Sequence, residues 1–280
     1  MSTDDPRARP LPGPCYGTPP MGATTDLAAL ARRAALAGGE IVRSAARATV
    51  AESKGAGDYV TEVDRASERE IRAVLEAELP DVPVVGEEGG GHEGPRHWLV
   101  DPLDGTTNFV HGFPLVGVSV ALVENGAPLV GAVHAPFLGD VWVAARGAGA
   151  TAERPDGSIE ALRVSARPAV RAVVGTGFPF RRKELLPRYL RVMGAGLERF
   201  EDLRRPGAAS LDLAWVAAGV FDGFFELGLS PWDVAAGGLL VEEAGGVVSD
   251  WRGGTDYLSG DILAGPPDVH AELLRLAATP

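Results

Sequence analysis

The chain has 280 residues, of which 45% are hydrophobic, so it can fold around one large core or two moderate ones. Its 26 basic and 38 acidic residues give a formal net charge of −12, and such a surface repels nucleic acid and anionic membranes. We therefore expect no direct nucleic-acid partner and no membrane partner. The single cysteine, Cys15, excludes an intrachain disulfide and a cysteine-based zinc site, which fits a reducing cytoplasm.

The composition divides the chain into a tail and a globular part. Residues 1–20 contain six prolines and lack the apolar segment of a signal peptide, so we predict a disordered tail over residues 1–22. The longest apolar runs, such as residues 115–123, are far shorter than the ~20 residues that span a bilayer. We expect an N-terminal α+β unit over residues 23–167 and a C-terminal α/β unit over residues 168–280.

Hydrophobic periodicity predicts two helices in the first ninety residues, with Thr25 and Asp64 as their caps. The pair Gly38-Gly39 lowers the helix propensity of the first one and indicates close packing against a neighbour. A flexible loop with charged ends separates the two helices. The predicted elements are a helix over 26–46, a strand over 49–53, a loop over 54–58, a helix over 65–79 and a strand over 82–85.

The pattern changes after residue 110. Three β-rich runs separated by turn signals predict an antiparallel meander, and from about residue 168 strands and helices alternate. The meander covers 115–124, 128–135 and 141–146. The later strands are predicted at 169–175, near 203, at 223–226, 247–251 and 261–264, and the later helices at 185–200, 211–218, 232–244 and up to about 277.

The most informative stretch is Trp-Leu-Val-Asp-Pro-Leu-Asp-Gly-Thr-Thr-Asn-Phe, residues 98–109. We predict a buried strand that stops at Asp101, a tight turn, and a helix that starts near Gly105 with Asp104 at or beside its N-cap. Two carboxylates collect Mg²⁺, and the free N–H groups of a helix start favour phosphate. Taken alone, the same two aspartates could simply end a strand and cap a helix, without binding a metal.

Two further acidic elements lie elsewhere in the chain. Glu87 and Glu88 follow a predicted strand beside glycines, and Asp233 opens a helix after a proline turn. Read singly, the first is a solvated acidic turn and the second is a capping aspartate. They support a metal site only because they occur in a fixed order along the chain with residues 98–109.

Together, three motifs in order resemble the inositol monophosphatase family of lithium-sensitive, Mg²⁺-dependent phosphatases. The resemblance covers about residues 24–278 and rests on Gly86-Glu87-Glu88, on residues 101–109, and on Trp232-Asp233-Val234-Ala235-Ala236-Gly237. It implies a layered αβαβα sandwich, the fold class of this family and of fructose-1,6-bisphosphatase. It also implies two to three Mg²⁺ ions per active site.

The resemblance assigns metal and catalytic roles residue by residue. It implies that Glu87, Asp101 and the Leu103 carbonyl bind one ion, where the family usually has isoleucine in place of leucine. It also implies that Asp101, Asp104 and Asp233 hold a second ion. Thr106 and Glu87 resemble the pair that orients the attacking water, and Asp64 the residue that supports that threonine. His111 is expected to be structural or adjacent to the substrate and not a general base.

The resemblance also assigns binding roles. It implies that the backbone at Gly105 and Thr106 cradles the phosphate, and that Lys54 and Asp58 lie on a mobile loop that helps hold a third metal. It implies that Asp233 borders the substrate, together with residues that contact the substrate alcohol. These are Gly207, Ala209 and Glu226, the last lying seven residues before Asp233 as the family pattern requires.

The expected activity is hydrolysis of a small sugar or cyclitol monophosphate, with myo-inositol 1-phosphate first among the substrates. Histidinol-phosphatase, fructose-1,6-bisphosphatase and nucleotide 3′-phosphatase activities share the metal site and stay open. So does a regulatory role in binding another protein, since some bacterial relatives associate with the transcription machinery. The resemblance further implies a homodimer, and the cysteine usage leads us to expect a cytoplasmic location.

Overall fold

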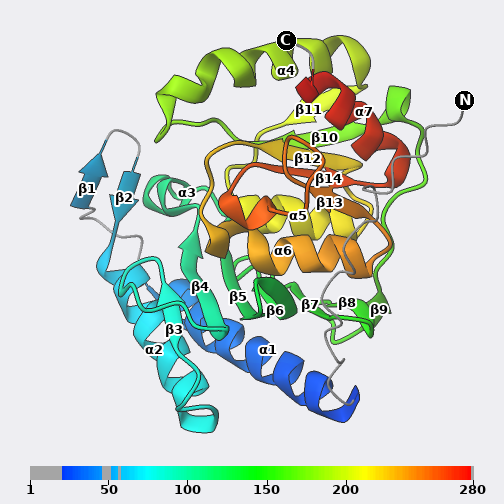
Figure 1. The fold of residues 1–280 in the computed structure, drawn as a ribbon. Coiled ribbons are helices and arrows are strands. Elements are labelled where there is room, and N and C mark those ends of the chain that lie inside the picture. The colour runs from blue at the N-terminus through cyan, green and yellow to red at the C-terminus, as the bar shows by residue number, and fades with distance from the viewer. Residues whose placement is uncertain (1–20, 46–51, 56–57, 279–280) are drawn as a thin grey trace, which may run out of the picture.

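The computed structural model describes residues 21–45, 52–55 and 58–278, so residues 1–20 of the predicted tail lie outside it. Its helices and sheets alternate in five layers, which confirms the αβαβα expectation (Figure 1). From the bottom of Figure 1 these are one helix pair, a seven-stranded sheet, a buried helix pair, a five-stranded sheet and a last helix pair. No described helix is long and apolar enough to cross a bilayer.

The N-terminal part builds the first helix pair and the large sheet. Its strand order is β3-β4-β5-β6-β7-β8-β9, antiparallel except for the β3–β4 pair. A two-stranded hairpin, β1–β2, precedes α2. The bounds are α1 Met21–Ser44, β1 Glu52–Gly55, β2 Asp58–Val60, α2 Glu62–Glu78, β3 Val84–Gly86, β4 Arg96–Asp104, α3 Thr106–His111, β5 Gly117–Glu124, β6 Ala127–His134, β7 Val141–Ala145, β8 Gly149–Glu153 and β9 Ile159–Ala161.

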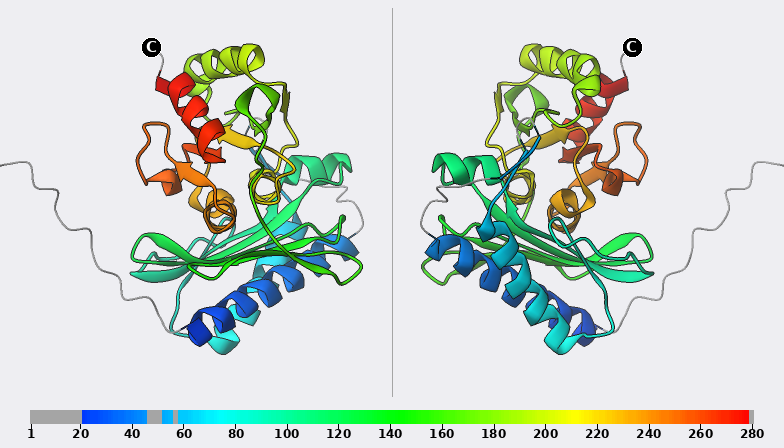
Figure 2. Two further views of the ribbon diagram at one scale, coloured as in Figure 1. Left: turned by 90° about the vertical axis from the view of Figure 1, so that its right-hand side faces the viewer. Right: turned by 90° about the vertical axis from the view of Figure 1, so that its left-hand side faces the viewer.

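Strand β4 is buried on both faces because helices cover both sides of the large sheet (Figure 2). Trp98 and Val100 pack in the core beneath α1 and α2, whereas Leu99 packs in the core beneath the central helices. This alternation follows from the two-residue period of a strand. It also explains why the three residues before the first aspartate of β4, Trp98, Leu99 and Val100, are all apolar.

The central helices are α5, Ala209–Ala217, and α6, Pro231–Glu243. Residues 233–241 of α6 are all buried, because this helix contacts β6 of one sheet and β13 and β14 of the other. Small residues allow this close approach: a Cβ on Gly131 of β6 would lie 2.8 Å from Ala236 Cα. The Ala- and Gly-rich sequence of α6 thus reflects a helix packed between two sheets.

The C-terminal part builds the small sheet, in the order β11-β10-β12-β14-β13, with β10 parallel to its neighbours β11 and β12. Its outer face packs on α4 and α7 around Tyr189, Phe225 and Trp251. The bounds are β10 Val173–Thr176, α4 Leu186–Arg199, β11 Asp202–Arg204, β12 Gly223–Glu226, β13 Val247–Ser249, β14 Ile262–Gly265 and α7 Pro267–Ala278.

Two local predictions around the site were wrong. Strand β4 does not stop at Asp101 but continues to Asp104 through an irregularity in its pairing with β5, whereas the predicted helix start is confirmed, with Gly105 as the N-cap of α3 and Asp104 beside it. Thr61, and not Asp64, caps α2, because Asp64 is the third residue of a capping box and its carboxylate accepts from the Thr61 N–H.

Candidate metal and phosphate site

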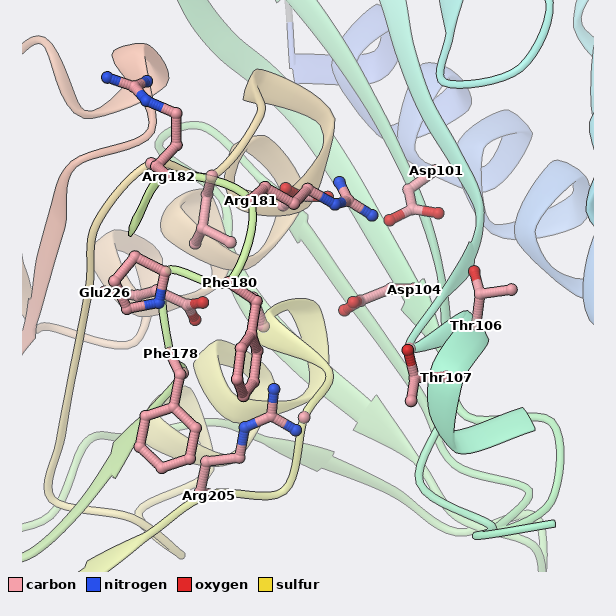
Figure 3. A pocket seen from close by; sticks show the side chains of 18 of the residues that line it. Asp101, Asp104, Thr106, Thr107, Phe178, Phe180, Arg181, Arg182, Arg205 and Glu226 are labelled. Atoms are coloured by element: carbon pink, nitrogen blue, oxygen red, sulfur yellow. The ribbon is translucent and has the colours of Figure 1, made fainter. Parts of the chain in front are cut away.

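A cavity of about 350 Å³ lies at the end of β4, and residues from both the N-terminal and the C-terminal part of the chain line it. Figure 3 shows Asp101, Asp104 and Thr106 on one wall and Phe180, Arg181 and Glu226 on the facing wall. The first wall belongs to β4 and α3, and the second to β12 and the loop before α4. Residues from both halves of the chain therefore line one cavity.

Five carboxylates line this cavity, and four of them are the predicted metal ligands: Glu87, Asp101, Asp104 and Asp233. Burial, followed by the charges of Glu87, Asp104 and Asp233, raises the pKa of Asp101 well above its usual range. Burial, followed by the charge of Asp233, raises the pKa of Asp104 to about 7. The group is thus a concentration of negative charge that a cation would stabilise.

Hydrogen bonds fix two of these carboxylates from behind. Oδ2 of Asp104 accepts from the backbone N–H of Ser210 at 2.7 Å and from its hydroxyl at 2.6 Å. Oδ2 of Asp233 accepts from the Ser230 N–H at 2.7 Å, within the capping box of α6. Each carboxylate is therefore oriented by the N-terminal turn of a central helix.

Thr106 lies beside the carboxylates at the start of α3. Its hydroxyl is within hydrogen-bonding distance of Asp64 Oδ1, at 3.0 Å, and of the Leu103 carbonyl, at 3.1 Å. Burial raises the pKa of Asp64, and hydrogen bonds from Thr61 and Thr106 oppose this shift. The Leu103 N–H in turn donates to Asp101 Oδ1 at 3.0 Å, so strand end and helix start form one hydrogen-bonded unit.

The donor set is one that Mg²⁺ accepts. Every group offered by the predicted ligands is an oxygen, either carboxylate or carbonyl, and hard oxygen ligands are what Mg²⁺ requires. Within the described part of the chain, however, no three acidic, histidine or cysteine side chains form a ready-made cage. The carboxylates instead surround an open cavity, which suits an ion that keeps several of its waters.

The predicted substrate residues lie in the same cavity. Gly105, Gly207 and Ala209 line it, together with Glu226. The Asn108 side chain donates to the Pro206 carbonyl at 2.9 Å and thereby ties α3 to the loop that carries Gly207. Burial, followed by the charge of Asp233, raises the pKa of Glu226 well above its usual range.

The other predicted residues have different positions. His111 lines the cavity, whereas Asp64 lies behind Thr106 and does not line it. Lys54 lies on β1 and Asp58 on β2, so the expected loop is a short hairpin. The segment between the hairpin strands, residues 56 and 57, lies outside the described residues.

Sequence reasoning missed several residues around this cavity. Phe178 and Phe180 line it, and the Arg205 guanidinium lies 5.3 and 5.6 Å from the centres of their rings (Figure 3). Arg181 reaches from the same loop to within 3.7 Å of Glu87. The run Phe-Pro-Phe-Arg-Arg-Lys at 178–183 was a visible signal, because such a run is too aromatic and basic for an ordinary exposed turn.

Comparison with known proteins finds matches over most of the chain. The profile of the inositol monophosphatase family matches residues 24–279. The Nus factor SuhB of Pseudomonas aeruginosa is 46% identical over 257 residues, covering 88% of this chain and 93% of that protein. The Haemophilus influenzae Nus factor SuhB is 42% identical over 251 residues, covering 87% of this chain and 92% of that protein.

Solved structures show the same fold. The extragenic suppressor protein suhB of Bartonella henselae superposes with a TM-score of 0.83 at 35% identity, covering 91% of this chain and 99% of that one. The inositol monophosphatase of Anabaena (Nostoc) superposes with a TM-score of 0.79 at 34% identity, covering 91% and 96% of the two chains.

These relatives correct one expectation. The exclusion of a direct nucleic-acid partner was wrong, because several relatives at 42–46% identity are named Nus factors and not phosphatases. The physical reason is that net charge is an average over the whole surface. Here three consecutive cations, Arg181, Arg182 and Lys183, lie in the segment that leads into α4 despite the overall charge of −12.

Proposed function

The chain belongs to the inositol monophosphatase family, and from this membership we propose that it hydrolyses the phosphate monoester of a small sugar or cyclitol, with myo-inositol 1-phosphate as substrate. The observation that supports the proposal most is the cavity in which Asp101, Asp104 and Asp233 lie beside Thr106. Buried like charges at this density are costly for the fold unless a cation joins them. Homodimer formation and a cytoplasmic location are part of the same proposal.

The proposed mechanism gives each residue one task. Glu87, Asp101, Asp104, Asp233 and the Leu103 carbonyl would hold Mg²⁺, which when bound supplies Lewis-acid stabilisation of the phosphoryl oxygens and the leaving oxygen. Glu87 and the Thr106 hydroxyl would orient the attacking water, with Asp64 fixing the hydroxyl.

The remaining residues of the cavity would hold the substrate. The backbone N–H groups at Gly105 and Thr106 would take the phosphate oxygens. Glu226, Gly207 and Ala209 would contact the hydroxyl-bearing ring. Each of these groups lines the one cavity, so the ring and its phosphate could be bound together.

The direct test is phosphate release from a panel of monophosphates with Mg²⁺: inositol 1-phosphate, histidinol phosphate, fructose 1,6-bisphosphate and a nucleoside 3′-phosphate. Asp101→Asn should abolish turnover while circular dichroism stays unchanged, because the variant removes a carboxylate proposed to bind both ions. Li⁺ should inhibit by competing for the second ion. Near-wild-type, Mg²⁺-dependent turnover in Asp101→Asn would overturn the site assignment.

We also propose a second role, in transcription, because the relatives at 42–46% identity are named Nus factors. The test is copurification of RNA polymerase and its associated RNA with the tagged wild-type chain and with Asp101→Asn. If RNA polymerase copurifies with both proteins, the transcription role does not depend on hydrolysis. Retention by neither would leave the phosphatase role alone.

A further inference from the structure

Helix α2 carries a buried carboxylate, Glu68, that does not line the cavity. Glu68 is only 3% exposed and lies one helical turn after Asp64. Its Oε2 accepts from the Glu88 N–H at 2.8 Å, and its Oε1 accepts from the Gly89 N–H at 2.9 Å. These are the two backbone N–H groups that directly follow Glu87.

Arg72 also binds both sides of the turn at residues 86–90 through hydrogen bonds. Its Nε donates to Glu68 Oε1 at 2.8 Å, its Nη1 to the Val84 carbonyl at 3.0 Å and its Nη2 to the Gly90 carbonyl at 2.6 Å. Val84 precedes Glu87 by three residues and Gly90 follows it by three. The Glu68–Arg72 pair therefore holds both sides of the turn that presents Glu87 to the cavity.

The fit between the pair and the turn leaves little freedom. A Cβ on Gly86 would lie 2.4 Å from the Glu68 carboxyl carbon, so only glycine permits this approach. On the opposite side, the Glu87 N–H donates to the Val100 carbonyl of β4 at 3.2 Å. Glu87 is thus fixed between β4, which carries Asp101, and the pair on α2.

The same face of α2 holds the other parts of the site. The Ser67 hydroxyl donates to the Pro102 carbonyl at 2.9 Å, and Asp64 accepts from Thr106. One rigid helix thereby contacts the Glu87 turn, the end of β4 and the start of α3. A rigid element that orients ligands from behind is what a precise metal site needs.

We propose that Glu68 and Arg72 are positioning residues that set the affinity of the cavity for Mg²⁺ by fixing Glu87. This inference rests on the proposed Mg²⁺ role of Glu87. Neither residue lines the cavity, so neither contacts the ion or the substrate. Their effect reaches the ion through the backbone of residues 86–90.

The test is calorimetric titration of Mg²⁺ into the full, substrate-free chain and its variants. Glu68→Gln keeps the shape of the side chain but replaces one acceptor oxygen with a donor that faces an N–H. Loss of such support typically costs about 10–100-fold in metal affinity, so the Kd for Mg²⁺ should rise at least about tenfold. Glu70→Gln, at an exposed position of the same helix, is the control and should bind as wild type.

A second variant and a second measurement keep the test decisive if Glu68→Gln folds poorly. Arg72→Lys cannot bridge the Val84 and Gly90 carbonyls and should weaken Mg²⁺ binding in the same direction, with the exposed Arg69→Lys as its control. Hydrogen exchange should show protected amides at residues 88 and 89 in the wild type and exposed ones in Glu68→Gln.

The outcomes separate this inference from the proposed activity. A lower Tm in Glu68→Gln with Mg²⁺ affinity equal to that of Glu70→Gln would make the pair merely structural and overturn the inference. Unprotected amides at residues 88 and 89 in the wild type would do the same. If the predicted pattern of Mg²⁺ binding appears but no substrate releases phosphate, the positioning role stands and the proposed function falls.

Discussion

The Thr106 hydroxyl lies 3.0 Å from Asp64 Oδ1, while Asp64 Oδ2 accepts from the Thr61 N–H and hydroxyl. The carboxylate thus accepts three donors through two oxygens. Asp64→Asn replaces one acceptor with a donor and should leave Thr106 misoriented. We expect kcat to fall by about 10²-fold with KM nearly unchanged, as for the loss of an oriented proton-transfer group. Steady-state kinetics will check this, with the exposed Glu62→Gln as control. A matching loss in both variants would contradict it.

Mg²⁺ binding should release protons near neutral pH. The pKa of Asp104 is raised to about 7 by burial, so this carboxyl is partly protonated at pH 7, whereas a metal ligand must be ionised. The affinity for Mg²⁺ should therefore fall as the pH drops from 8 to 6. Titration calorimetry in two buffers of different ionisation enthalpy measures the proton release. Asp104→Asn should bind more weakly and lose part of the release; an unchanged release would assign the proton elsewhere.

Glu226→Gln should alter the choice of substrate. A carboxylate accepts hydrogen bonds from ring hydroxyls, and replacing one oxygen with an amide leaves a mismatched partner that costs about 1–3 kcal/mol. We expect kcat/KM for inositol 1-phosphate to fall about tenfold relative to that for p-nitrophenyl phosphate, which lacks ring hydroxyls. Equal losses on both substrates would show that Glu226 is structural. Histidinol phosphate or a bisphosphate would then deserve equal weight as substrate.

Gly39→Ala should destabilise the fold without touching the site. Gly39 lies within α1, and a Cβ there would lie 2.0 Å from the His134 ring nitrogen on β6. Such overpacking in a tight core typically costs about 1–3 kcal/mol, which outweighs the better helix propensity of alanine. Thermal unfolding should show a Tm lower by several degrees. Gly194→Ala, whose added Cβ meets nothing within 4 Å, is the control and should be neutral or stabilising. Equal Tm values for the two variants would refute the packing argument.

The buried His134 should make the fold sensitive to mild acid. Burial lowers its pKa below the ordinary value of 6.5, so the unfolded chain binds this proton more readily than the folded one. The stability is then fully present above pH 6.5 and is lost as the pH falls toward the folded-state pKa. Chemical denaturation between pH 7.5 and 5 should show a smaller loss for His134→Gln than for wild type or the exposed His92→Gln. Identical slopes in all three would exclude His134 as the cause.

The sequence predicted the fold best where hydrophobic periodicity and turn residues indicate the same type of secondary structure. The meander at 115–146 and the alternation after residue 168 were predicted because turn residues and periodicity agree there. Boundaries near the site were less predictable. Strand β4 continues past Pro102 because its pairing with β5 resumes at Asp104, and such pairing depends on a partner far along the chain.

The cavity itself was predictable only in part. Its acidic residues stand in motifs, so Asp101, Asp104 and Asp233 could be placed together through the family resemblance. Glu68 and Arg72 could not, because their sequence, an acidic and a basic residue four apart on a helix, is typical of an exposed ion pair. Only the packing of α2 against the Glu87 turn shows that Glu68 is buried and engaged with backbone.

The central helix pair also limits how the chain can be divided. Because α6 contacts β6 on one side and β14 on the other, it leaves neither sheet a free inner face. A fragment ending at residue 167 would expose Leu99, Ala121 and Val133 to water. A fragment starting at residue 168 would expose the side of α6 that packs on the large sheet. The two parts of the chain therefore share one hydrophobic core. We expect the two fragments to associate with each other and not to fold as independent domains.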